Sequence, residues 1–419
     1  MQFSPTAAVV AFLASSATLA IGGSTANAQD ATVQGPGYAV SETAVVHPSI
    51  GAETGYISNV FYEDESPAGA GIFRILAKLA LTPVGDESEK GGTPPDFTYS
   101  AGARFEYEEY LSGSSTVTDQ RNLGLGADLA LGIKPASTFP ITFDDHFIRT
   151  NRPTNFESNS TLSRDINTFK AGVKYVPKGR NISGRLRYTN TLDFFESDDS
   201  AFANRMLNNV QLGVDWQFLP ITRFFAEASY GYNGGLGSGS TKVSSTPMRG
   251  TIGVATAVTE KITIRANGGY AHGSYSAGAS FSSYIYGLEA GLRYSPVGRV
   301  RLIFDRDFRD SINSNFYGDY MLKLALDQQI NRVMVEASVE GHLRSYGGVD
   351  MSFGGGSTRD DVIFATGVRA SYEMRDWLGL NASYSLRSVQ TDFVSTIGGD
   401  VDDPDFARHQ VTAGATAAF

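Results

Sequence analysis

The chain has 419 residues, a formal net charge of −10 and no cysteine, and 19% of its residues are charged. The lack of cysteine excludes a disulfide scaffold and thiolate metal sites, and the acidic balance argues against nucleic acid as a partner. The 46 glycines, 20 tyrosines and 26 phenylalanines are typical of a sheet-rich protein with many turns. Beyond the N-terminus, no stretch approaches the ~20 apolar residues that a spanning helix needs.

The N-terminus has the pattern of a secretory signal peptide. Residues Met1–Ala28 contain no charged side chain, and the apolar run Ala7–Ile21 precedes an Ala-Asn-Ala ending. Signal peptidase cleaves after such a small-x-small sequence, so we expect cleavage before Gln29. The apolar run is short for a membrane anchor, which is the alternative. We then expect a short periplasmic segment over Gln29–Ala44 and a single domain over Val45–Phe419.

The rest of the chain repeats one unit, an alternating run of ten or more residues followed by a turn. In Val210–Phe218 and in Leu378–Leu386, apolar and polar side chains alternate strictly, which indicates strands with one apolar face. Short turns such as Pro177–Arg180 alternate with longer polar loops such as Tyr346–Arg359. The pattern predicts about eighteen antiparallel strands. Their predicted starts are Val45, Gly71, Phe97, Arg121, Phe139, Asp165, Ile182, Met206, Thr222, Thr246, Lys261, Ser283, Arg299, Phe316, Arg332, Asp361, Trp377 and Phe406.

Two all-β architectures fit many alternating strands: a soluble sandwich or propeller, and a transmembrane barrel. The aromatic residues favour the barrel, because they gather at both strand ends as two membrane girdles would require. Those near the short turns are Tyr175, Trp216, Phe218, Phe224, Tyr294, Tyr372 and Trp377. Those near the long loops are Tyr62, Tyr110, Phe194, Tyr232, Tyr275, Phe308 and Tyr346. The sequence therefore predicts an all-β antiparallel barrel in the outer membrane of a Gram-negative bacterium, with both termini periplasmic.

The C-terminus supports this prediction. A final strand ending in Phe419, with Gly414 five residues earlier, resembles the signal that the barrel assembly machinery reads. We therefore expect that machinery, outer-membrane lipid and lipopolysaccharide to be partners of the chain.

A barrel of this strand number has a backbone circle roughly 35 Å across, too wide for side chains to fill. Both charge signs occur in the rows that alternation turns inward, and charged rows set the selectivity of a pore. The densest group is Arg301–Arg309, which is the best candidate for a functional lining. The predicted lumen-lining residues are Arg185, Arg187, Arg265, Arg301, Asp305, Asp307, Lys323 and Asp327.

Catalysis has little support in the sequence. The five histidines are spread over distant segments, and none belongs to a nucleophile motif. We expect a protein that is not an enzyme and that needs no cofactor or metal. The histidines are His47, His146, His272, His342 and His409.

Three segments carry a family resemblance. The first is Leu212–Asn233, with its Leu-Pro turn and Tyr-x-Tyr ending, and the second is Tyr294–Gly341, which contains the motif Arg306–Ser311. The third is the opening strand His47–Tyr62. With these segments the chain resembles the beta-barrel porin 2 family over nearly the whole mature length. The resemblance implies polysaccharide export, because some members of that family serve exopolysaccharide secretion together with a periplasmic polysaccharide-export protein.

Three functions stay open from the sequence. The first is an outer-membrane conduit for exopolysaccharide export, in which case a periplasmic polysaccharide-export protein and a polysaccharide are partners. The second is a general passive-diffusion porin for small solutes. The third is a structural outer-membrane protein without transport.

Overall fold

The computed structural model describes residues 33–83, 95–152, 163–179, 181–312, 314–348, 358–397, 400–402 and 404–419. Its strands are β1 (Tyr38–Ser41), β2 (Ala44–Ile57), β3 (Ala70–Pro83), β4 (Phe97–Leu111), β5 (Asn122–Ile133), β6 (Ile141–Thr150), β7 (Arg164–Tyr175), β8 (Ile182–Phe195), β9 (Arg205–Leu219), β10 (Thr222–Gly235), β11 (Ser245–Ala257), β12 (Ile262–Tyr275), β13 (Phe281–Ser295), β14 (Gly298–Asp310), β15 (Phe316–Ile330), β16 (Val333–Gly347), β17 (Arg359–Arg375), β18 (Leu378–Thr391), β19 (Ser395–Ile397), β20 (Asp400–Asp402) and β21 (Phe406–Ala418). The described helices are α2 (Ser115–Thr118) and η2 (Asp198–Ala203). No described helix is long and apolar enough to cross a membrane.

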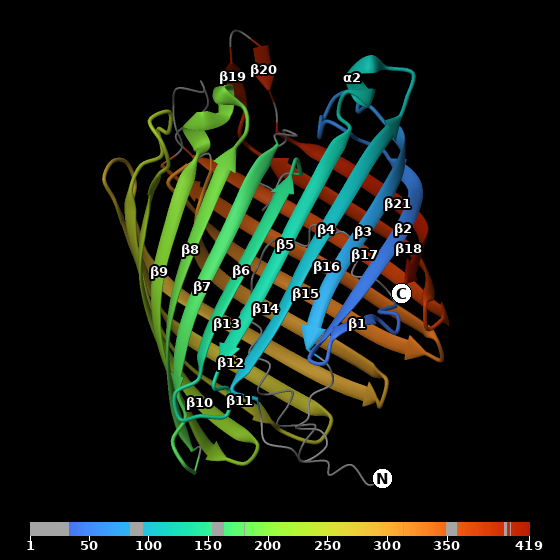
Figure 1. Cartoon of the computed structure of the whole chain (residues 1–419). Helices are drawn as coiled ribbons and strands as arrows, with labels where there is room; N and C mark the ends of the chain where they lie inside the picture. Colours follow the sequence, from blue (N-terminus) through green and yellow to red (C-terminus); the bar gives the residue numbers. More distant parts are fainter. Residues whose placement is uncertain are drawn as a thin grey trace.

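Eighteen antiparallel strands, β2–β18 and β21, close into one barrel (Figure 1). Each strand pairs with the next along the chain, and β21 lies between β18 and β2, where Tyr56 faces Val411. The predicted fold class is confirmed. The predicted strand starts agree closely with the structure: β17, for example, begins at Arg359 where Asp361 was expected.

The two faces of the wall differ as the alternation predicts. Apolar side chains of the outer row stand exposed, including Leu212 at 56% and Leu324 at 49%. Their neighbours in sequence, such as Asp215 and Lys323, form ion pairs on the other face. An apolar outer band around a polar interior is the arrangement of a barrel that stands in lipid.

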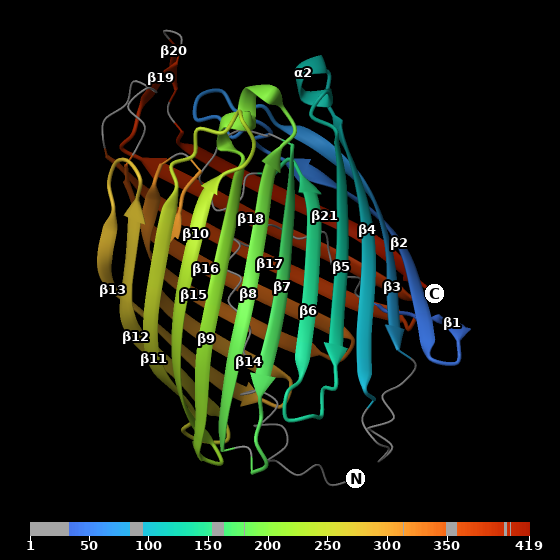
Figure 2. The same cartoon turned by 60° about the vertical axis from the view of Figure 1, so that its left-hand side comes forward.

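Long connections and short turns lie at opposite ends of the barrel (Figure 2), and α2, η2, β19 and β20 all lie at the long-loop end. The C-terminal end of β21 lies at the short-turn end, where the backbone N–H of Phe419 donates to Pro48 at 2.9 Å. That this end faces the periplasm stays a prediction. The predicted signal peptide Met1–Ala28 lies outside the described residues.

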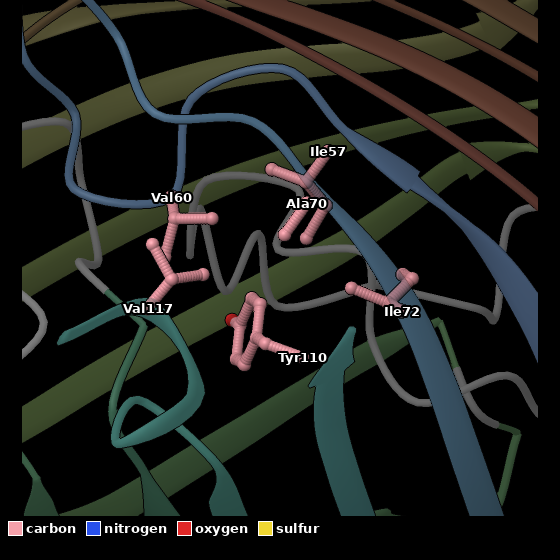
Figure 3. Packing of buried hydrophobic residues seen from close by; sticks show 6 residues of the cluster. All are labelled: Ile57, Val60, Ala70, Ile72, Tyr110 and Val117. Atoms are coloured by element: carbon pink, nitrogen blue, oxygen red, sulfur yellow. The ribbon is translucent and has the colours of Figure 1, made fainter. Parts of the chain in front are cut away.

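An apolar cluster joins the long-loop ends of β2, β3 and β4 (Figure 3). Val117 of α2 lies there next to Val60 and Tyr110, which anchors the β4–β5 connection to the barrel. Buried apolar surface of this kind is what holds a long loop in a single position. The remaining members are Ile57, Ala70 and Ile72.

The long-loop girdle prediction is wrong for three residues. Tyr62, Tyr110 and Tyr346 are 1%, 4% and 6% exposed and cannot contact lipid. Instead they contact charged side chains: Arg408 lies over the Tyr62 ring, Arg359 lies over the Tyr346 ring, and the Tyr110 hydroxyl donates to Glu108. Two other members of the set, Phe194 and Tyr232, are exposed as expected.

The closing seam between β21 and β2 is tight at Gly414. A Cβ atom at this position would lie 2.5 Å from the Ala52 carbonyl oxygen, so the backbone of β2 would have to move. We expect Gly414→Ala to cost about 1–3 kcal/mol, as overpacking usually does. Gly250→Ala is the matched control, because a Cβ at Gly250 would meet nothing within 4 Å. Urea unfolding in detergent micelles measures both, and equal stability of the two variants would contradict this account.

Candidate functional site: the charged lumen

A cavity with a volume of about 450 Å³ lies against the inner wall formed by β14–β18 and β21. Its described lining has a clear excess of positive charge. The cationic members are Arg152, Arg301, Lys323, Arg369, Arg387 and Arg408. The carboxylates are Asp327, Glu336 and Glu340. Six cations against three anions give the cavity a positive field that concentrates anions.

Strand register sets the position of the charges on this wall. Lys323 faces Glu340 on the neighbouring strand, and their side chains form an ion pair at 2.8 Å. Asp327 holds Arg299 at 2.6 Å and lies 3.6 Å from Arg301. These ion pairs with the carboxylates hold the cationic side chains in fixed orientations along the wall.

Two lining residues come from outside the strands. Tyr62 follows β2, has a φ of 63° and packs edge-on against Phe406 with the ring centroids 5.1 Å apart. Arg152 follows β6 and donates to Glu106 and Glu108 of β4. Burial disfavours the charge of Arg152, but these carboxylates outweigh it and raise the pKa of the guanidinium above its ordinary value. Both side chains add to the lining of the cavity.

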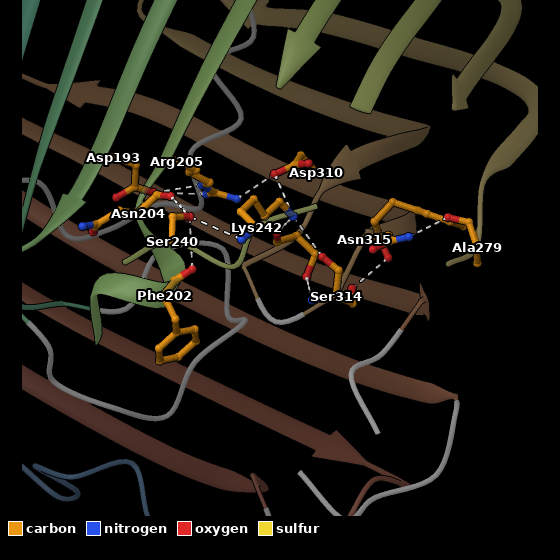
Figure 4. Close-up of polar contacts among 12 residues, drawn as sticks. Asp193, Phe202, Asn204, Arg205, Ser240, Lys242, Ala279, Asp310, Ser314 and Asn315 are labelled. Atoms are coloured by element: carbon orange, nitrogen blue, oxygen red, sulfur yellow. Dashed lines mark hydrogen bonds and ion pairs between the residues drawn. The ribbon is translucent and has the colours of Figure 1, made fainter. Parts of the chain in front are cut away.

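A second polar cluster lies at the long-loop end of the barrel (Figure 4). Arg205 at the start of β9 binds Asp193 of β8 at 3.2 Å and Asp310 at the end of β14 at 3.0 Å. Lys242, between β10 and β11, lies 3.3 Å from Asp310 and donates to the Ser311 carbonyl oxygen at 2.6 Å. We call these four charged side chains, Asp193, Arg205, Lys242 and Asp310, the mouth bridge.

The mouth bridge changes the shape of the opening. In the sheet order, β10–β13 stand between β9 and β14. On a circular wall, strands this far apart would be roughly 25 Å from each other, beyond the reach of an arginine and an aspartate. The 3.0 Å contact between Arg205 and Asp310 therefore requires the strand ends to bend inward. The mouth is narrower than the strand number alone suggests.

Three of the predicted lumen residues, Arg301, Lys323 and Asp327, meet in the cavity. The others lie elsewhere in the barrel. Arg185 of β8 forms ion pairs with Asp215 and Glu227, and Arg265 of β12 lies over the Phe225 ring at 4.4 Å. Arg187 is on β8, Asp305 is on β14, and Asp307 binds Arg249 of β11 at 2.7 Å.

The segment Arg301–Arg309 does not form one lining. Arg301 belongs to the cavity, whereas Arg306 is in the outer row and lies 5.0 Å from the Tyr320 ring centre. Sequence reasoning missed Tyr62, Arg152 and Arg408 as lining residues. Alternation in the last strand could have found Arg408, but no local pattern points to the other two.

The seven predicted girdle residues near the short turns are all exposed, from 39% for Tyr372 to 53% for Phe218, with Tyr175 at 46%. Their contact with lipid stays a prediction, as does the assembly role of Gly414 and Phe419. The other girdle residues are Trp216, Phe224, Tyr294 and Trp377.

The five histidines lie on five different strands, β2, β6, β12, β16 and β21. His342 is buried beside Asp319, with Nδ1 3.0 Å from the carboxylate, and has a structural role between β15 and β16. In the described part of the chain, no group of three or more histidine or acidic residues is placed to hold a metal ion.

A closed antiparallel wall, an apolar outer band and a charged interior define the class: the chain is an outer-membrane β-barrel. No family model matches the sequence, and no curated protein is similar to it.

Several solved structures share the barrel form. The outer membrane protein OpdK from Pseudomonas aeruginosa has a TM-score of 0.46 and 10% identity, covering 89% of this chain and 99% of that one. OccAB4 from Acinetobacter baumannii has a TM-score of 0.46 and 11% identity, covering 89% and 98%. The siderophore receptor PirA from Pseudomonas aeruginosa has 0.41 and 8%, covering 89% and 80%. These likenesses concern the fold, and the assignment to the class rests on the wall of this barrel itself.

Proposed function

We propose that this barrel is a passive channel for small hydrophilic solutes, with a preference for anions. The observation that carries the proposal is the cavity of about 450 Å³, whose described lining holds six cations and three carboxylates. Charged side chains along a pore select the sign of the permeating ion. The fixed cations give an anion favourable contacts along the wall.

Export of a polysaccharide, the first hypothesis from the sequence, has less support. A hydrated polymer needs a wide and continuous path, whereas the mouth bridge draws the ends of β9 and β14 together across the opening. The small-solute channel, the second hypothesis from the sequence, agrees better with a lumen narrowed by fixed side chains.

The test measures ion selectivity in a planar bilayer. Under a potassium chloride gradient, we expect a reversal potential that shows preference for chloride over potassium. Arg301→Gln combined with Arg408→Gln removes two charges from the cavity and is expected to reduce this preference strongly. Lys178→Gln is the control, because Lys178 lies in the short turn after β7 and outside the cavity.

Polymer exclusion separates the two functions. Neutral polyethylene glycols of increasing size lower the conductance only while they can enter the pore. We expect exclusion to begin at a small polymer size. Entry of long polymers together with an absence of ion preference would overturn the small-solute proposal and favour a polysaccharide conduit.

A further inference from the structure

The ladder between β13 and β14 is incomplete. Their pairing ends at Tyr286 and Arg306, although β13 extends further to Phe281 and β14 further to Asp310. Both strands stay paired on their other sides over these stretches, with β12 and with β15. In the described wall, this is the one seam at which both strands run on for four or more residues without pairing to each other. We call the gap the seam opening.

The mouth bridge explains why the seam opens. Asp310, at the end of β14, is held toward the lumen by Arg205 and Lys242. The first residues of β13, from Phe281 on, instead keep their backbone pairing with β12. The seam opening is thus roughly 10 Å high along the barrel axis, from the strand rise and tilt, and it lies in the long-loop half of the wall.

Side chains take over the missing backbone contacts. Arg306 donates to the Tyr284 carbonyl oxygen and, at 3.0 Å, to the Ser283 hydroxyl, while Arg249 donates to the Phe308 carbonyl oxygen. Above the gap, the Asn315 amide donates to Ala279 at 2.8 Å, so the gap is closed at its top (Figure 4). Unpaired backbone groups facing lipid cost several kcal/mol each, and these donors reduce that cost.

Aromatic rings fill the seam opening. Phe281 stacks on Phe308 with the ring centroids 4.9 Å apart and the planes at 7°, and Phe316 meets Phe281 edge-on at 5.1 Å. By alternation, Phe281 belongs to the lumen-facing row of β13, whereas Phe308 and Phe316 belong to the outer rows of β14 and β15. Rings from opposite faces of a continuous sheet cannot stack on each other. These rings therefore meet inside the gap.

Apolar surface continues on both sides of these rings. On the lumen side, Ala271 and Ile285 are buried next to Phe281. On the outer side, Tyr284 is 72% exposed and Leu288 44% exposed in the band that faces lipid. Apolar side chains thus flank the rings on both sides, and the Arg306 guanidinium lies over the Phe308 ring, 5.2 Å from its centroid, at the outer edge of the gap.

We propose that the seam opening is a lateral portal, through which a lipophilic small molecule with a hydrocarbon chain passes between the membrane and the lumen. Rings held by stacking can part without breaking a backbone hydrogen bond, whereas an intact ladder cannot open in lipid at a comparable cost. The occupant is lipophilic because the outer end of the path meets the acyl chains of the membrane. This portal is distinct from the cavity of the proposed anion channel, which lies along β14–β18 and β21; of the two strands at the seam, only β14 takes part in both.

The test uses a probe that cannot leave the membrane. The full barrel is placed in phosphatidylcholine vesicles that contain a phosphatidylcholine with a diazirine near the end of one acyl chain. After irradiation, mass spectrometry locates the labelled residues. We expect labelling of Leu288 on the lipid face and also of Ile285 on the lumen side of the portal. Ala325 in the aqueous cavity is expected to stay unlabelled, because the probe reaches the lumen only through the seam.

Variants decide whether the rings control the passage. Phe281→Ala removes the central ring and is expected to increase the labelling of Ile285 severalfold. Phe304→Ala is the matched control, since the Phe304 ring lies 5.8 Å from the Tyr286 ring in the outer row below the opening, and it is expected to leave that labelling unchanged. If Phe281→Ala does not fold, Phe281→Leu shortens the side chain more mildly and serves the same purpose. Labelling confined to the lipid face in both the wild type and the Phe281 variant would overturn the proposal.

Discussion

Asp310→Ala is expected to destabilise the barrel by about 3–5 kcal/mol, because it removes one partner from a set of buried charges. The side chains of Asp310, Arg205 and Lys242 are 5%, 8% and 5% exposed, so the two cations lose a carboxylate that water cannot replace. The same variant is expected to raise single-channel conductance, since the ends of β9 and β14 are no longer held together. Urea unfolding in detergent micelles and planar-bilayer recordings measure the two effects.

Glu196→Ala is the control for this prediction. It also removes a carboxylate from an ion pair with an arginine, but Arg149 and Glu196 are 24% and 33% exposed. Exposed ion pairs contribute only about 0–1 kcal/mol. Equal losses of stability in the Asp310 and Glu196 variants, or an unchanged conductance after Asp310→Ala, would refute a role of the mouth bridge in shaping the pore.

The second large effect is expected on the lipid face. Leu324→Arg places a charge in the middle of the outer row of β15, between Leu302 and Val339 of the neighbouring strands. A charged side chain near the bilayer midplane of such barrels costs about 2–4 kcal/mol. The free energy of unfolding in phospholipid vesicles measures this cost.

Ser338→Arg is the matched control for Leu324→Arg. Ser338 is next to Val339 in sequence, but it lines the cavity and therefore places the new charge in water. We expect a small effect on stability. If both variants lost the same stability, the assignment of inner and outer rows on β15 and β16 would be wrong.

The wall could be predicted from sequence because alternation is a local signal. A period of two identifies a strand and its two faces from neighbouring residues alone, and it placed Lys323 inside and Leu324 outside. Even the two least regular runs, starting at Phe139 and Thr246, are the strands β6 and β11.

The site was harder to predict because its contacts are not local. Arg205 and Asp310 are 105 residues apart in sequence, and no pattern in either strand indicates that they meet. Tyr62 and Arg152 lie in connections, where side-chain direction follows no period. Alternation assigns residues to the lumen row, but it cannot show which of them face each other across the barrel.

The closing seam pairs the first strand of the barrel with the last. Tyr56 faces Val411 across it, so β2 pairs with a strand that lies more than 350 residues further along the chain. Every other strand pair of the wall joins strands that follow each other along the chain and needs only a short loop to close. Pairing of β2 with β21 is therefore the step with the greatest loop-closure cost and the slowest search. Until it occurs, the growing sheet has two unsatisfied edges, which have to be shielded from lipid and from other chains.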